Sequence, residues 1–266
     1  MQTTVAGSSV FLSTGGQELD ARKPAVLLLH GAGLDHSVWT LQARYLAHHG
    51  RSVIVPDLPG HGRSDGAPLT SIGDLAHWCW SLLDSLELDR VSLVGHSMGA
   101  LIALAMAATE PKRVRSLCLI AAAAEMPVHP DLLAAARDDL ETASALISMW
   151  GFGPTGQVGG NRVPGMQIRL AGQRLVERSK PGVLAADLIA CSNYGDGLRD
   201  AGKVQAPAHL LLGAEDRMTP PGKGRQLATA MVQSAGGTKI TVLPSCGHMI
   251  MAERPNETID VLAALS

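Results

Sequence analysis

The sequence predicts an α/β protein with a mostly parallel sheet, helices on both faces of that sheet and a helical cap inserted at one edge. Three observations predict this architecture. Short continuous runs of Val, Ile and Leu end at Gly or Pro, segments of helical spacing separate these runs, and one long stretch interrupts the alternation. Continuous apolar runs of this length are typical of strands buried on both faces. A chain of 266 residues is also long enough to bury one sizeable core.

Strands and helices alternate along the chain, which favours strand–helix–strand units in a parallel sheet. The first apolar run ends at His30-Gly31 and the second at Pro56-Asp57, and Gly50 stands where the helix between them should end. The expected strands are residues 25–29, 52–55, 91–94, 114–120, 208–212 and 239–243. The expected helices are residues 38–49, 72–86, 98–108, 222–232 and 256–265.

Residues 122–204 break this alternation, because they contain no run typical of a buried strand and because Gly, Pro and Met punctuate short helical pieces. The segment nevertheless holds Trp150 and Phe152, although aromatic residues make up only 3% of the chain. Such side chains are typical of segments that bury something, so we expect an ordered insertion rather than a linker. The predicted organisation is a core of residues 1–121 and 205–266 with a cap of residues 122–204 over the carboxyl edge of the sheet.

The charge balance and the cysteines exclude several classes of partner. Lys and Arg total 22 against 24 Asp and Glu, and the net charge of −2 gives no broad positive surface for a nucleic acid or an anionic membrane. No basic patch followed by an apolar run opens the sequence, and no stretch approaches the ~18 apolar residues of a membrane span. The four cysteines form no C-x-x-C pair, so we expect reduced thiols in a cytoplasmic protein. The oligomeric state stays open.

A G-x-S-x-G motif at Gly95, Ser97 and Gly99 is the strongest chemical signal in the chain. It follows the apolar run 91–94 and precedes the Ala- and Leu-rich segment 98–108, which is the strand–turn–helix context of a nucleophile elbow. The tight turn needs Gly on both sides and presents the serine at a helix N-terminus, where free N–H groups favour developing negative charge. We therefore predict that Ser97 is the nucleophile.

A serine hydroxyl needs a base to take its proton and an acid to orient that base. His248 lies in a loop between the strand 239–243 and the last helix, at the carboxyl edge of the sheet where catalytic groups collect. Asp216 follows the strand 208–212, and the chain order Ser97, Asp216, His248 is the order associated with this elbow. The sequence therefore predicts a catalytic triad of these three residues.

The segment His30-Gly31-Ala32-Gly33 follows the first strand, and its glycines allow the backbone to approach a bound ligand closely. We expect the backbone N–H groups of Ala32 and Met98 to form the oxyanion hole. No group of Cys, His and carboxylates has metal-ligand spacing, and the serine mechanism needs none, so neither a metal nor a cofactor is expected.

These pieces resemble the α/β-hydrolase fold family, in particular its serine esterase-like members with a helical cap. The resemblance covers nearly the whole chain and implies that the turn at residues 57–64, including Asp57, His61 and Ser64, is structural. The matching segments are His30 to Gly33, Asp57 to Ser64, Gly95 to Gly99, Gly213 to Asp216 and Gly247-His248.

The resemblance implies hydrolysis but does not fix the substrate. Epoxide hydrolases and haloalkane dehalogenases use an aspartate at the elbow, where this chain has Ser97. The G-H-S-M-G elbow is similar to those of esterases, which favours a small to medium carboxylic ester or lactone cleaved through an acyl-enzyme. Carbon–carbon bond hydrolases of ring-cleavage products usually carry Asn before the serine, where this chain has His96. That activity stays an alternative, as does a low-turnover receptor that binds a small ligand.

Apolar and amphipathic side chains of the cap are expected to line a compact substrate pocket, since Met and aromatic groups adapt to irregular apolar ligands. The alternative for each of these side chains is a place in the core of the cap itself. The predicted lining residues are Met126, Met149, Trp150, Phe152, Met166 and Tyr194.

Overall fold

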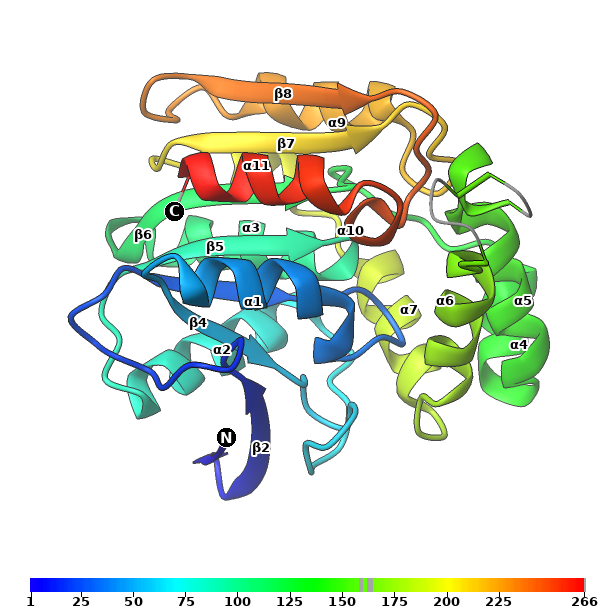
Figure 1. Cartoon of the computed structure of the whole chain (residues 1–266), viewed down its shortest axis with the longest axis horizontal. Coiled ribbons are helices and arrows are strands. Elements are labelled where there is room, and N and C mark those ends of the chain that lie inside the picture. The colour runs from blue at the N-terminus through cyan, green and yellow to red at the C-terminus, as the bar shows by residue number, and fades with distance from the viewer. Residues whose placement is uncertain (158–159, 162–164, 266) are drawn as a thin grey trace.

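The computed structural model describes residues 1–157, 160–161 and 165–265, with an eight-stranded sheet at its centre (Figure 1). The strand order is β1-β2-β4-β3-β5-β6-β7-β8. Strands β3 to β8 pair in parallel, whereas β2 runs antiparallel to both β1 and β4. The strands are β1 (Gln2–Val5), β2 (Ser8–Ser13), β3 (Ala25–Leu29), β4 (Ser52–Pro56), β5 (Val91–His96), β6 (Val114–Ile120), β7 (Ala208–Gly213) and β8 (Thr238–Leu243).

Every strand expected from an apolar run is present, and the predicted mostly parallel sheet is confirmed. The β1–β2 hairpin was not predicted, because its strands are short and rich in Ser and Thr. Its signal is a period of two, in which the buried Val10 and Leu12 alternate with less buried neighbours. Ala6 and Gly7 turn the chain with φ values of 47° and 80°, and two successive positive values are typical of the type I′ turn of a two-residue hairpin loop.

Helices cover both faces of the sheet, because successive strand side chains point in opposite directions. In β3, Leu27 and Leu29 join the apolar cluster of α2, α3 and α9, whereas Val26 and Leu28 join that of α1 and α11. Figure 1 shows α1 and α11 in front of the sheet and α2, α3 and α9 behind it. These helices are α1 (Thr40–His48), α2 (Ile72–Ser85), α3 (Met98–Thr109), α9 (Pro221–Ala230) and α11 (Pro255–Leu265), joined by the short η1 (His36–Trp39), η2 (Pro111–Arg113) and α10 (Ile250–Glu253).

Between β6 and β7 the described residues form helices and no strand. In Figure 1, α4 to α7 lie beyond the carboxyl ends of the strands. They share an apolar cluster that includes Leu132, Phe152 and Leu188 and is joined by Leu34 and Met249 from loops of the sheet. The elements are α4 (Pro130–Asp138), α5 (Leu140–Gly151), η3 (Pro154–Gly156), α6 (Ile168–Glu177), α7 (Val183–Asn193) and α8 (Gly197–Ala201). We call residues 122–204 the cap. That they form a unit separate from the core remains a prediction.

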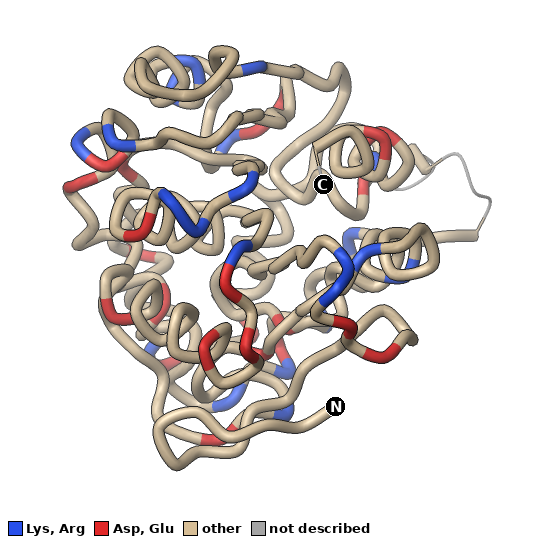
Figure 2. Tube along the Cα trace, turned by 90° about the vertical axis from the view of Figure 1, so that its left-hand side faces the viewer, with Lys and Arg blue, Asp and Glu red and all other residues tan. Residues whose placement is uncertain are grey.

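Charged side chains are spread over the molecule. Along the described trace in Figure 2, Lys and Arg are interspersed with Asp and Glu.

Candidate active site

Ser97 occupies a strained turn between β5 and α3. Its backbone has φ 53° and ψ −118°, a conformation that a residue with a side chain adopts only when its surroundings impose it. The N–H of Ser97 donates to the carbonyl of Ile120 at 3.0 Å. A Cβ atom on Gly95 would collide with the carbonyl oxygen of Gly99, and one on Gly99 would collide with that of Leu29. Both glycines of the motif are therefore required by close packing of the backbone, as the elbow predicts.

His248 and Asp216 meet at the carboxyl edge of the sheet, each in the loop after its strand. Nδ1 of His248 lies 2.9 Å from Oδ2 of Asp216, and both side chains are buried. Oδ1 of Asp216 accepts from the backbone N–H groups of Met218 and Thr219 at 2.9 and 2.8 Å. Burial would raise the pKa of Asp216, but the imidazole of His248 and the hydrogen bonds from Thr219 together hold it below 3.8. An ionised Asp216 accepts the Nδ1 proton and leaves Nε2 of His248 free to act as a base.

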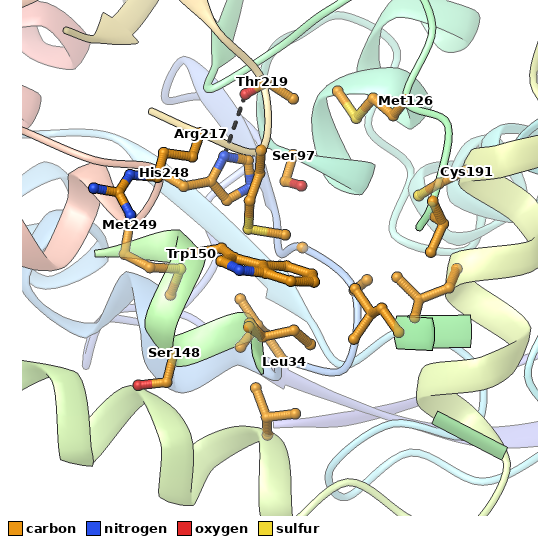
Figure 3. A pocket seen from close by; sticks show the side chains of 18 of the residues that line it. Leu34, Ser97, Met126, Ser148, Trp150, Cys191, Arg217, Thr219, His248 and Met249 are labelled. Atoms are coloured by element: carbon orange, nitrogen blue, oxygen red, sulfur yellow. Dashed lines mark hydrogen bonds between the residues drawn. The ribbon is translucent and has the colours of Figure 1, made fainter. Parts of the chain in front are cut away.

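Thr219 is a part of this group that the sequence did not reveal. Its hydroxyl donates to Oδ2 of Asp216 at 2.7 Å and lies 3.2 Å from Nδ1 of His248 (Figure 3). The available signal was its place three residues after Asp216, where a short side-chain turn brings a hydroxyl back to the carboxylate. Thr219 thereby fixes the carboxylate oxygen that His248 uses.

The loop after β3 lies directly against Ser97. A Cβ atom on Gly31 would stand 3.3 Å from Cβ of Ser97 and 2.8 Å from Nδ1 of His96. The next residue, Ala32, lines the same cavity as Ser97. Met98 is the first residue of α3, where backbone N–H groups lack partners within the helix. Ala32 lies at the same cavity as Ser97, and Met98 follows Ser97 in the chain; the role of their N–H groups as an oxyanion hole stays a prediction.

A cavity of about 470 Å³ opens beside Ser97 and His248 (Figure 3). Of the predicted lining residues, Met126, Trp150 and Phe152 do line it. Its remaining apolar wall comes mainly from the cap, with Val128, Leu132, Ile147, Val176 and Leu188. A mostly apolar wall with a few convergent polar groups is typical of a small-molecule site.

The structure does not bring Met149, Met166 and Tyr194 to this cavity. Met149 is 44% exposed, because it stands one residue before Trp150 on α5 and helical geometry turns it to another side. Met166 precedes α6 and is 54% exposed. Tyr194 ends α7 on the side of α8, where its hydroxyl donates to Asp200 at 2.8 Å.

The cap contacts the loop that carries His248. The carbonyl of Gly151, at the end of α5, accepts from the N–H groups of His248 and Met249 at 2.8 and 3.1 Å. The buried carboxylate of Glu253 accepts from Gly247 on this loop and from Gly153 in the cap, both at 3.0 Å. Burial raises the pKa of Glu253 even though these hydrogen bonds favour its charged form. The position of His248 therefore depends on the cap as well as on the sheet.

One group of side chains in the described part of the chain has the spacing of a metal site, formed by Asp35, His36 and Asp57. Its atoms already have protein partners: Asp57 accepts from the backbone and Nδ1 of His36, both at 2.8 Å, and from the N–H of Arg63 at 2.9 Å. Asp35 accepts from Ser37 at 2.8 Å and pairs with Arg178 at 3.1 Å. The group braces the loops around the turn at residues 57–64.

A model of the Alpha/beta hydrolase family matches residues 26–261. The chain belongs to this family. This match confirms the fold and the family that the sequence predicts. Relatives of the chain include hydrolases of different substrates. Among the residues that the structure describes, no helix is long and apolar enough to cross a membrane.

Similar proteins are known by sequence and by structure. A pimeloyl-[acyl-carrier protein] methyl ester esterase of Chromobacterium violaceum is 31% identical over 96% of this chain and 97% of its own length. A 2-hydroxy-6-oxo-6-phenylhexa-2,4-dienoate hydrolase of Burkholderia cepacia is 27% identical over 90% and 87%. The crystal structure of an enol-lactonase from Burkholderia xenovorans shares the fold with a TM-score of 0.87 at 22% identity, over 100% of this chain and 99% of that one.

Proposed function

We propose that this chain is a serine hydrolase that cleaves a small to medium carboxylic ester or lactone through an acyl-enzyme on Ser97. The observation that carries the proposal is the buried hydrogen bond of 2.9 Å between His248 and Asp216 at the wall of the cavity that Ser97 also lines. An imidazole held by a carboxylate at Nδ1 is suited to take a proton at Nε2. The proposed catalytic groups are therefore Ser97, His248 and Asp216.

In the proposed reaction, Oγ of Ser97 attacks the carbonyl carbon of the substrate while Nε2 of His248 takes the hydroxyl proton. The negative charge that develops on the carbonyl oxygen is stabilised by the N–H groups of Ala32 and Met98. When the carbonyl reforms, the bond to the leaving oxygen breaks, and His248 returns the proton to the alcohol or to the opened lactone. A water molecule then gives a proton to His248 and attacks the acyl carbon, and His248 passes that proton to Oγ of Ser97 as the bond from Oγ to the acyl carbon breaks and the acid leaves.

The cavity supports a compact, largely uncharged acyl group. Its volume of about 470 Å³ lies toward the lower end of the ~300–1,000 Å³ range of small-molecule sites. Met126, Trp150 and Phe152 supply apolar surface from the cap, which we propose roofs Ser97. The esterase from Chromobacterium violaceum, 31% identical, supports an ester as the substrate class.

Four free and buried cysteines, whose thiol pKa values burial raises, fit a reducing compartment such as the cytoplasm.

A carbon–carbon bond hydrolase of ring-cleavage products is the second candidate, favoured by the 27% identity to the dienoate hydrolase of Burkholderia cepacia. Relatives with each of these activities match this chain, so the substrate has to separate the two candidates. Purified protein should be assayed in the steady state against a panel of short esters, lactones and ring-cleavage dienones. Many turnovers of an ester or lactone would support the proposal, and turnover of dienones alone would favour the second candidate. Binding without turnover of any of these compounds would indicate a receptor.

A further inference from the structure

Asp187 lies on α7 in the cap and reaches two loops of the sheet. Its Oδ2 accepts the backbone N–H of Gly33 at 2.8 Å and lies 2.8 Å from Nε2 of His61. The side chains of Asp187 and His61 are both 1% exposed. One buried carboxylate therefore joins a cap helix, the loop after β3 and the turn at residues 57–64. None of these contacts is part of the proposed proton transfer.

The same face of α7 presses on the loop after β3 through a second residue. Leu184 lies one helical turn before Asp187, so both side chains project from one side of the helix. A Cβ atom on Gly33 would stand 2.8 Å from Cδ1 of Leu184. Gly33 also has a φ of 67°, a conformation in which glycine is favoured. Glycine at position 33 therefore allows α7 to pack closely against the loop after β3.

The hydrogen bonds of His61 indicate that its ring carries a charge. Nδ1 lies 3.0 Å from the carbonyl of Pro59, which can only accept, and Nε2 faces the carboxylate of Asp187. Both ring nitrogens must then hold a proton. Burial lowers the pKa of His61, but the charge and hydrogen bond of Asp187 outweigh burial, and the pKa is raised above 6.5. Asp187 and His61 thus form a buried ion pair between cap and sheet.

Ala32 is held between two fixed neighbours. Gly31 lies against His96 and Ser97, too close for a side chain, and Gly33 donates to Asp187. The direction of the Ala32 N–H group depends on the backbone at both neighbours, since the intervening peptide planes are rigid. Loss of the acceptor at Asp187 would remove the attachment at Gly33.

We propose that Asp187 is a positioning residue: by accepting from Gly33 it holds the loop after β3, and with it the Ala32 N–H, in register with Ser97. This inference rests on the proposed function, because Ala32 matters for the reaction only as an oxyanion donor. Under this proposal, the loop that carries the Ala32 N–H becomes ordered only when the cap docks on the sheet. A cap that moves away from the sheet takes with it the acceptor that orders the loop.

The test compares Asp187→Ala with Asp187→Asn and with a matched control, Ser144→Ala. Asparagine retains an oxygen acceptor for Gly33, and its amide nitrogen would take the place of Oδ1, an atom without a hydrogen-bond partner among the described residues. Ser144 is a fully buried cap residue that bonds to Glu141 and Glu177 within the cap, away from the loop after β3. The substrate is p-nitrophenyl acetate, whose short acyl group offers the least surface to the cap wall.

We expect Asp187→Ala to lower kcat by at least about tenfold with less than about a threefold change in KM, because only stabilisation of the transition state is lost. The affinity for a boronic acid that mimics the tetrahedral intermediate should fall in parallel. Asp187→Asn should recover most of kcat, and Ser144→Ala should leave kcat and KM unchanged. A rise in KM at constant kcat, or an equal loss of kcat in Ser144→Ala, would overturn the inference.

Two further outcomes remain informative. If Asp187→Ala does not fold, the double variant His61→Phe/Asp187→Leu replaces the ion pair with apolar side chains, an exchange that proteins commonly tolerate, and still removes the acceptor for Gly33. Its kcat should fall as described for Asp187→Ala, and an unchanged kcat would contradict the inference. Wild-type protein that turns over no ester or lactone would refute the proposed function itself, whereas active wild type with fully active Asp187 variants would refute only the role of Asp187.

Discussion

Nε2 of His96 donates a hydrogen bond to the backbone carbonyl of His248 at 3.0 Å, and His96 directly precedes Ser97 in the chain. The proposed nucleophile and base, which come from different strands, are therefore tied to each other by a neighbour of the nucleophile. The N–H of His248 donates in turn to the carbonyl of Gly151 in the cap at 2.8 Å. The backbone of the base is held from the sheet on one side and from the cap on the other.

Replacing His96 with Phe should disturb the base without removing it. Phe retains an aromatic ring but removes one of two donors to the carbonyl of His248, which keeps the N–H of Ile250 at 2.9 Å, and the loss of such a hydrogen bond costs about 0.5–1.5 kcal/mol. We expect the free energy of unfolding to fall by that amount and kcat to fall about 10- to 100-fold, because small displacements of catalytic groups are costly. Burial, with the nearby His248, lowers the pKa of His96 to about 3, so the shape of the pH profile between pH 5 and 9 should not change. Urea denaturation and steady-state kinetics check this, and unaltered kcat would count against it.

Thr219→Val should remove a hydrogen bond to the carboxylate of Asp216 while preserving the shape of the side chain at position 219. A hydrogen bond to a charged group is worth about 1.5–3 kcal/mol, so its loss should reduce kcat by about tenfold or more, with KM little changed. The matched control is Thr241→Val, which removes a hydroxyl that bonds to His209 on the sheet, away from the cavity. Equal kcat values for the two variants would show that the bond from Thr219 to Asp216 has no part in catalysis.

The ion pair of His61 and Asp187 should make stability depend on pH. Folding raises the pKa of His61 above the ~6.5 of a free imidazole, so its contribution is complete below pH ~6.5 and is lost as the pH rises through the raised value. The other titratable groups near it are His30, whose pKa burial lowers to about 4, Asp57, whose pKa is also lowered, and Cys191, whose pKa burial and Asp187 raise. None of these three titrates between pH 6 and 9.

The free energy of unfolding of the wild type should therefore decline between pH 6 and 9 more steeply than that of His61→Phe/Asp187→Leu. Chemical denaturation at several pH values measures both slopes. Parallel slopes for the two proteins would mean that folding does not raise the pKa of His61, and a shallower decline for the wild type would mean that His61 is uncharged in the folded state.

Trp150 and Met149 are neighbours in sequence that differ in their access to the cavity. Trp150→Ala should enlarge the cavity and shift the preferred p-nitrophenyl ester to longer acyl chains, because each further methylene that fits is worth up to ~0.8 kcal/mol of burial. Met149→Ala should leave the preference unchanged, since Met149 is exposed outside the cavity. A series from acetate to palmitate measures the preference. If the two variants shift it alike, or if the wild type prefers the longest chains, the compact-pocket account fails.

The sequence predicted those parts of the molecule that depend on local patterns. Apolar runs marked the parallel strands, and the motif around Ser97 and the order of Asp216 and His248 marked three groups that the structure places at one edge of the sheet. The β1–β2 hairpin was not predicted, because its strands are polar and are stabilised by pairing with the rest of the sheet.

The cap was harder to interpret. Composition identified Met149 and Met166 as apolar, but only the rotation of α5 and the start of α6 decide which side chains face the cavity. Asp187 could not be found by any local pattern, because its partners Gly33 and His61 lie 154 and 126 residues away in the chain. Contacts of this kind exist only once the cap has packed on the sheet.

The most direct test of the account is covalent labelling of Ser97. Purified protein is treated with a fluorophosphonate, and the adduct is counted by intact mass and located by peptide mapping. The account predicts one adduct per chain, on Ser97, formed at a rate that falls when His248 is replaced by Ala, and no adduct on Ser97→Ala. An adduct that persists in Ser97→Ala, or active wild-type protein that carries no adduct on Ser97, would contradict it.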